Sequence, residues 1–404
     1  MYRDPLRVCR GSLVYPIARF PTTQSCMPAT CLLPELWEII IGFLQDDTID
    51  LKSTSLACRS FVSHAQSHIF REIQVSIWAK HYGDYGEEKG VQANRLTALM
   101  ESSPHLIRHV RSLTVEGCEP EMVIPLARIR WSRVDTLELE DITEDPSDDC
   151  ARSIHALVGL SSLCTLTIRN CCHAEQLHTI LSHCSAALEN VSLSSCKISP
   201  TPAFRPLKSP RPRQRIRKLV LVDSDGASPL LDSPACPFDL TSLNHLHLTR
   251  MTVARLDSFL RRICSTVECL SVDARDYISR SLDLSLLPAL VHIDCHGFGY
   301  GPVLNTMLGG MPTENHINTI HLFAPRAVVE WDESLTTYMR DFDEIVMDHL
   351  PALREVSLTM YIEQHRHEDR DPYEFNHPGL MQVMVAALPR LHEKGMLSMD
   401  ICLT

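Results

Sequence analysis

The fold of this chain is decided by a short pattern that is clearest in Leu163-Cys164-Thr165-Leu166-Thr167-Ile168-Arg169-Asn170-Cys171. Three apolar residues, Leu163, Leu166 and Ile168, are spaced as apolar-x-x-apolar-x-apolar. The last two alternate with polar residues, and side chains two apart in a strand point to the same face. The pattern therefore predicts a short strand with one face buried.

The same triplet recurs along the chain. A weaker eleventh copy lies around Leu397, Met399 and Ile401. Between last members, the steps from 115 to 322 run from 23 to 29 residues, and the step from 322 to 358 is longer. Ten clear copies are Val110/Leu113/Val115, Val134/Leu137/Leu139, Leu163/Leu166/Ile168, Leu188/Val191/Leu193, Ile216/Leu219/Leu221, Leu243/Leu246/Leu248, Val267/Leu270/Val272, Leu290/Ile293/Cys295, Ile317/Ile320/Leu322 and Leu353/Val356/Leu358.

Such a strand needs a return segment before the next parallel strand begins. Apolar residues at helical spacing predict return helices over 174–187 and 253–266. No single unit covers its own apolar face, so neighbouring units must stack. We therefore predict an α/β fold with parallel strands on a concave face and helices or loops on the convex face.

The array over residues 105–404 resembles leucine-rich repeats of the cysteine-containing type. Their consensus has Cys or Asn three residues after the last apolar position, and Cys118, Cys171 and Cys196 stand there. The resemblance implies a solenoid that holds a protein partner. Three polar or proline-rich stretches, near 200–215, 226–237 and 363–378, are predicted to be loop insertions.

Residues 32–75 follow a different pattern. One apolar stripe at helical spacing consists of Leu36, Ile39, Ile40, Phe43 and Leu44. A second helical pattern puts Leu51, Ser55, Cys58, Val62, Ala65 and Ile69 on one face. Helices this short do not make a stable core alone. We expect them to dock on the repeats, on a partner, or on both.

This module resembles the F-box, in the fungal form that begins Leu-Pro-x-Glu-Leu and runs into Ser-Leu-x-Cys-Arg. The second part is matched by Ser55-Leu56-Ala57-Cys58-Arg59, while Leu33 stands where the family usually has Pro and Pro34 follows. The resemblance implies a substrate receptor of a Skp–cullin–F-box ubiquitin ligase, with the repeats holding a protein substrate. It implies an adaptor contact made of Leu32, Pro34, Leu36, Ile39, Ile40, Leu44, Leu56, Cys58 and Phe61.

A second interpretation needs no ubiquitin ligase. Solenoids need capping elements at their ends, so the helices of 32–75, with a linker or cap over 76–104, would then only close the array. The chain would be a protein-interaction scaffold. Residues 1–31 are expected to form a disordered leader, with a mitochondrial presequence as the alternative.

The amino-acid composition limits the classes of partner that the chain is expected to bind. With 38 basic and 50 acidic residues among 404, the net charge is −12, which disfavours binding to nucleic acids and anionic membranes. No apolar run approaches the roughly 18 residues of a membrane span. Sixteen scattered cysteines without a CxxC pair indicate reduced thiols in the cytosol or nucleus.

No glycine-rich phosphate loop, GxSxG or HExxH motif is present, so we assign no catalysis, cofactor or metal ligand. The polar residues between the apolar strand positions are expected to face a protein substrate. Metal binding or pH sensing by a His/Asp ridge on the later strands is the alternative. The candidate substrate face is Glu138, Glu140, Arg169, His245, His247, Asp273, His292, Asp294, His296 and His321.

Overall fold

A computed structural model describes most of the chain in two compact units, Met1–Ala65 and Gln66–Thr404, here the helical unit and the sheet unit. The described residues are 34–45, 47–76, 90–142, 146–171, 173–196, 213–224, 227, 230–231, 233, 236–251, 256–263, 265–273, 282–297, 303–324, 333–362 and 377–403. The expected leader 1–31 lies outside them. Each unit is described by itself.

The helical unit contains α1 (Pro34–Gly42), α2 (Thr48–Ala57), a 3₁₀ turn (Arg59–Phe61) and the first half of α3 (Val62–Ile69). The Asp47 side chain caps α2 by accepting hydrogen bonds from the next turn. The second helical pattern, predicted over 51–69, is interrupted at Cys58. Cys58 is extended, with φ −149°, and the chain bends there before α3 begins.

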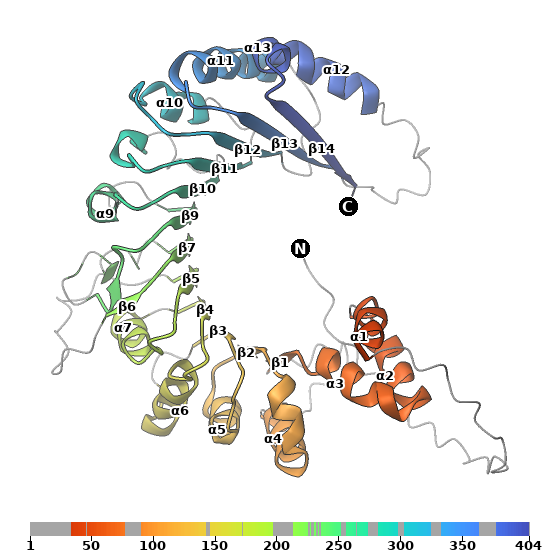
Figure 1. Cartoon of the computed structure of the whole chain (residues 1–404). Coiled ribbons are helices and arrows are strands. Elements are labelled where there is room, and N and C mark those ends of the chain that lie inside the picture. Colours follow the sequence, from red (N-terminus) through yellow and green to blue (C-terminus); the bar gives the residue numbers. More distant parts are fainter. Residues whose placement is uncertain are drawn as a thin grey trace. The chain divides into compact units, whose positions relative to one another are not determined.

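The sheet unit is built on twelve parallel strands that are hydrogen-bonded in chain order (Figure 1). Consecutive strands pair side by side, which is the arrangement that the recurring triplets predict. The strands are β1 (Glu72–Ser76), β2 (Ser112–Glu116), β3 (Thr136–Glu140), β4 (Thr165–Arg169), β5 (Asn190–Ser194), β7 (Lys218–Val222), β9 (His245–Thr249), β10 (Cys269–Asp273), β11 (His292–His296), β12 (Thr319–Ala324), β13 (Glu355–Ile362) and β14 (Leu397–Leu403).

The last two members of every apolar triplet fall on a strand, from β2 to β14, and in the ten clear copies the first member lies just before that strand. The register aligns equivalent positions, so Leu137 pairs with Leu166 and Leu166 with Val191. These apolar side chains are buried and their polar neighbours are not. Within this twelve-stranded sheet, the strand that was not predicted is β1, over Glu72–Ser76; it pairs with β2 at the start of the sheet.

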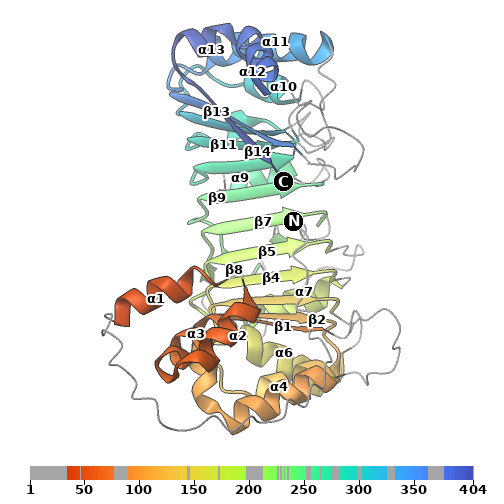
Figure 2. The ribbon, with the colours of Figure 1, turned by 90° about the vertical axis from the view of Figure 1, so that its right-hand side faces the viewer.

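Helices return the chain between strands and cover one face of the sheet (Figures 1 and 2). The helix predicted over 174–187 ends earlier, at Ser182. Of the helix predicted over 253–266, the structure shows α9 over Leu256–Ile263, and residues 253–255 lie outside the described residues. We call the other sheet face the open face. The helices are α4 (Val91–Ser102), α5 (Pro120–Arg128), α6 (Asp148–Val158), α7 (Ala174–Ser182), α9 (Leu256–Ile263), α10 (Val303–Gly309), α11 (Glu333–His349), α12 (His377–Ala387) and α13 (Pro389–Glu393).

Tight turns follow the strands. Asn170 and Asp141, directly after β4 and β3, have φ of 53° and 54°, a left-handed conformation that Asn and Asp tolerate better than most residues. The residue after such a turn points inward: Cys171, after Asn170, and Cys196, after Ser195, are fully buried. The Cys196 thiol lies 3.9 Å from the Ile168 carbonyl oxygen on β4. The turn after one strand therefore contacts the neighbouring strand of the sheet.

The predicted loop insertions need two corrections. Gln214–Arg215 form a short strand, β6, that pairs with β8 (Phe238–Asp239), so the 200–215 stretch ends in a ladder. Helix α12 begins at His377, inside the third predicted loop. Residues 200–212 and 363–376 lie outside the described residues. None of the described helices combines the length and the apolar character that crossing a membrane requires.

Candidate functional site

The helical unit presents an apolar face to solvent. Leu36, Ile39, Ile40 and Phe43 lie at i, i+3, i+4 and i+7 of α1, the spacing that gathers side chains on one side of a helix. Phe43 is 84% exposed and Leu56, on α2, is 88% exposed. Six of the eight large apolar side chains that are exposed in the described part of the chain belong to this unit.

The core of the same unit is small. Among its described residues, the buried side chains are Ile41, Leu51 and Ala65. The Trp37 and Phe61 rings pack with their centroids 4.5 Å apart and tie α1 to the turn before α3. Beside these three buried side chains, six large apolar side chains of the unit are exposed: Leu36, Ile39, Ile40, Phe43, Ile49 and Leu56.

The residues of the predicted adaptor contact differ in their exposure to solvent. Leu36, Ile39, Ile40, Leu56 and Cys58 are exposed, whereas Leu44 and Phe61 are half-buried. Leu32 and the Pro34 side chain lie outside the described residues. Sequence reasoning left Phe43 and Ile49 out of the contact, although both are strongly exposed; Phe43 was already part of the predicted stripe.

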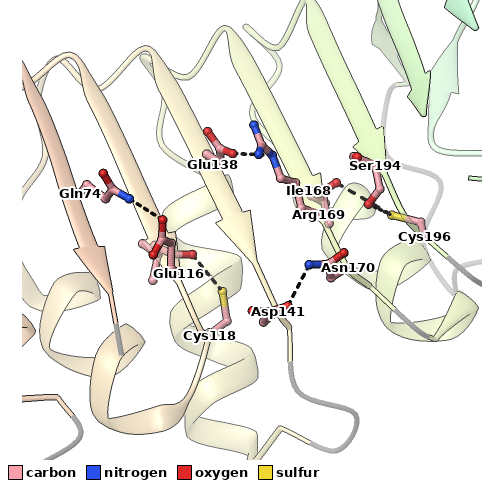
Figure 3. A network of polar contacts seen from close by, with 11 residues as sticks. Gln74, Glu116, Cys118, Glu138, Asp141, Ile168, Arg169, Asn170, Ser194 and Cys196 are labelled. Atoms are coloured by element: carbon pink, nitrogen blue, oxygen red, sulfur yellow. Dashed lines mark hydrogen bonds and ion pairs between the residues drawn. The ribbon is translucent and has the colours of Figure 1, made fainter. Parts of the chain in front are cut away.

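On the sheet unit, a network of polar contacts runs along the early strands and the turns that follow them (Figure 3). The Arg169 guanidinium on β4 lies 2.6 Å from a carboxylate oxygen of Glu138 on β3. Burial, followed by the charge of Asp141, raises the pKa of Glu140. The structure thus brings Glu138, Glu140 and Arg169 together, as predicted for the candidate face.

A second polar group occupies the open face of β9 to β12. His292 Nε2 and Asp294 Oδ1 are 2.7 Å apart, and His321 Nδ1 lies 3.3 Å from the same oxygen. The His296 ring stacks on Phe323, with centroids 4.5 Å apart. Four of the predicted residues, His292, Asp294, His296 and His321, therefore form one cluster, here the histidine cluster.

Of the other predicted residues, one lies apart from this cluster and one is buried beside it. His245 is exposed and its Nδ1 lies 2.9 Å from the Asn244 side chain. Asp273 is buried, so its place on the exposed substrate face is wrong. Asp273 is aligned with His296 on β11, so it belongs to the same row of side chains, and its burial depends on the neighbouring side chains and not on its place in the strand alternation.

Cys269 was not among the predicted site residues. It is aligned with His292 on the next strand, and a sulfur, a ring nitrogen and a carboxylate oxygen of Cys269, His292 and Asp294 all lie within 4.8 Å of one another. Burial, and then the charge of Asp294, raises the pKa of the Cys269 thiol to about 11. The signal was present in the sequence, because Cys269 directly precedes a strand leucine just as His245 does.

The neighbouring histidines favour the ionised form of the Asp294 carboxyl group. Burial opposes ionisation of Asp294, but the hydrogen bond from His292 and the nearby His321 and His296 outweigh it and lower the pKa of that carboxyl group. A half-buried carboxylate flanked by two histidine ring nitrogens is a preformed acceptor for hydrogen-bond donors.

His247 gives the sheet unit a pH-dependent stability. Burial, then His296 and Lys218, lowers the pKa of His247 to about 4, against the opposing charges of Asp294 and Asp273. Its two ring nitrogens face the Ser271 and Thr249 hydroxyl groups. Because the folded-state pKa lies below the unfolded value of about 6.5, the unfolded chain binds the extra proton, and stability falls between about pH 6.5 and 4.

Replacing His247 with Gln, which keeps a donor and an acceptor, is expected to remove this part of the pH dependence. Urea unfolding of the full chain at pH 7 and pH 5 measures it. The wild type should lose up to about 2 kcal/mol more than the variant between the two values. An equal loss in both proteins would show that His247 titrates normally in the fold.

No protein-family model matches the chain, and no similar curated protein was found. The assignment of function therefore depends on the two surfaces themselves.

Proposed function

We propose that this chain is the substrate-recognition subunit of a Skp–cullin–F-box ubiquitin ligase. In this proposal the helical unit is an F-box module that docks a Skp-type adaptor, and the sheet unit is a leucine-rich-repeat-like solenoid that binds a protein substrate. The observation that carries the proposal is the exposed apolar face of α1, made of Leu36, Ile39, Ile40 and Phe43.

The energetics favour a partner at this face. Removing a Leu, Ile or Phe side chain from water is worth about 1.5–3 kcal/mol. Large apolar patches on soluble proteins mark interaction sites, and the stripe on α1 suits the mode in which a helix lies in a groove of its partner. A unit with three buried side chains gains stability from such a partner.

The sheet unit suits the second role. Its open face presents fixed polar groups on rigid strands, such as the Glu138–Arg169 ion pair and the histidine cluster. Side chains held by neighbouring strands lose little freedom on binding, which favours recognition of a protein surface. The positions between the buried leucines vary without disturbing the core, so they are free to define a substrate.

The scaffold interpretation, in which the helices of 32–75 are only a cap, explains less. A cap exists to cover apolar surface at the end of an array. Here the helical unit adds exposed apolar surface, since Ile39, Phe43 and Leu56 are each more than half exposed.

Co-purification of partner proteins from cells tests the proposal. Tagged full-length chain, expressed in the organism that encodes it, is expected to co-purify with the Skp-type adaptor and a cullin. A Phe43→Asp variant should recover at least tenfold less of both, because a charge at the centre of an apolar contact is left unpaired. Quantitative mass spectrometry of the eluates measures the ratio. Equal recovery by both proteins, or no adaptor with either, would reject the proposal.

A further inference from the structure

We propose that Cys269, His292 and Asp294 bind a divalent transition-metal ion of the Zn²⁺ class on the open face of the sheet. The three side chains come from two adjacent strands, β10 and β11, whose register fixes them side by side. The proposal is independent of adaptor docking, since none of its ligands lies in the helical unit.

The geometry is that of a compact ligand set. The donor atoms of Cys269, His292 and Asp294 lie within 4.8 Å of one another. In a tetrahedral zinc site with bonds of about 2.0–2.3 Å, donors are about 3.3–3.7 Å apart. Small rotations of these half-buried side chains are enough to reach that spacing, because the backbone already places Cys269 opposite His292.

The donor types select the ion. A thiolate, an imidazole and a carboxylate together suit Zn²⁺ and its neighbours, whereas Ca²⁺ and Mg²⁺ prefer oxygen donors alone. The thiol of Cys269 gives up its proton to solvent when the ion binds. The ion then supplies the positive charge that offsets burying a thiolate beside the Asp294 carboxylate.

His321 extends the site onto a third strand. Its Nδ1 lies 3.3 Å from Asp294 Oδ1, and its ring meets that of His292 edge to face, with centroids 4.5 Å apart. A group that holds a ligating carboxylate in place typically changes metal affinity 10- to 100-fold. We assign His321 this positioning role, which leaves the fourth coordination place for water or a group of a bound partner.

Cobalt titration of the purified, chelator-treated full chain tests the site. Co²⁺ is expected to bind one ion per chain with a thiolate-to-cobalt band in the near ultraviolet, and Zn²⁺ should displace it because the site favours zinc. Mg²⁺ at the same concentration should leave the band unchanged. Absence of the band, or a band that Zn²⁺ does not remove, would overturn the proposal.

Variants identify the ligands. Cys269→Ala should abolish the band, and His292→Ala or Asp294→Asn should weaken Co²⁺ binding at least tenfold. His321→Ala should weaken it 10- to 100-fold and keep the band. Two matched controls, His245→Ala on the neighbouring strand and Cys164→Ala, should leave binding unchanged.

Circular dichroism establishes that each variant is folded, and Cys269→Asn replaces Cys269→Ala if the latter is not. A band that persists without the Cys269 thiol, or that disappears in the Cys164 control, would assign the metal to other residues and refute the site.

Discussion

A Leu36→Asp, Ile40→Asp double variant is expected to bind the Skp-type adaptor at least 100-fold more weakly than the wild type, a loss of about 2.7 kcal/mol. Both side chains lie one helical turn apart on the exposed face of α1. In a docked complex each aspartate would be an unpaired charge in an apolar contact, which costs more than the lost apolar burial alone. Calorimetric titration of the full chain measures the change.

The matched control adds the same two charges elsewhere in the helical unit. Gln45 and Ser63 are exposed polar residues outside the apolar stripe, so a Gln45→Asp, Ser63→Asp double variant should keep its affinity within about threefold. The stability of both variants should match the wild type, because Leu36 and Ile40 are exposed in the free chain. Equal weakening in both double variants would indicate a general charge effect and contradict docking by α1.

A Leu166→Ala variant is expected to lower the free energy of unfolding of the sheet unit by about 3 kcal/mol. Leu166 is fully buried in β4 and lies between Leu137 on β3 and Val191 on β5. Truncating a buried leucine loses its transfer free energy and leaves a cavity, for a total of about 2–5 kcal/mol. Urea unfolding followed by circular dichroism measures the difference.

Thr167→Ala is the control for that substitution. Thr167 follows Leu166 in the same strand and points to the open face, where it is half-buried. Its truncation should cost less than about 1 kcal/mol. A cost at Thr167 equal to that at Leu166 would mean that both faces of β4 are equally packed, which the alternation of buried and polar residues excludes.

The strands of the sheet were predictable because each has a buried face, which imposes the triplet on the sequence. β1 was missed although Phe70, Ile73 and Val75 keep the same spacing, because these residues were assigned to the end of the helical module of residues 32–75. The bend at Cys58 escaped for another reason. The apolar residues before and after it keep helical spacing, and spacing alone does not register a backbone that turns to place Phe61 on Trp37.

The sequence predicted which residues of the candidate site share a face of the sheet, but not which of them are exposed. Alternation placed His292 and Asp294 on the open face, and the register confirmed that they lie opposite Cys269 and His321. Burial depends on the size of side chains on neighbouring strands, which the sequence of one strand does not contain. Asp273 is buried, although its position in the strand, aligned with His296 on β11, is that of an open-face residue.

Titration of the purified wild-type chain with the purified Skp-type adaptor tests the central claim most directly. We predict a 1:1 complex with a negative heat-capacity change, the mark of apolar surface leaving water, as the exposed stripe on α1 requires. A folded chain that gives no heat and forms no complex with the adaptor would contradict the assignment to a ubiquitin ligase.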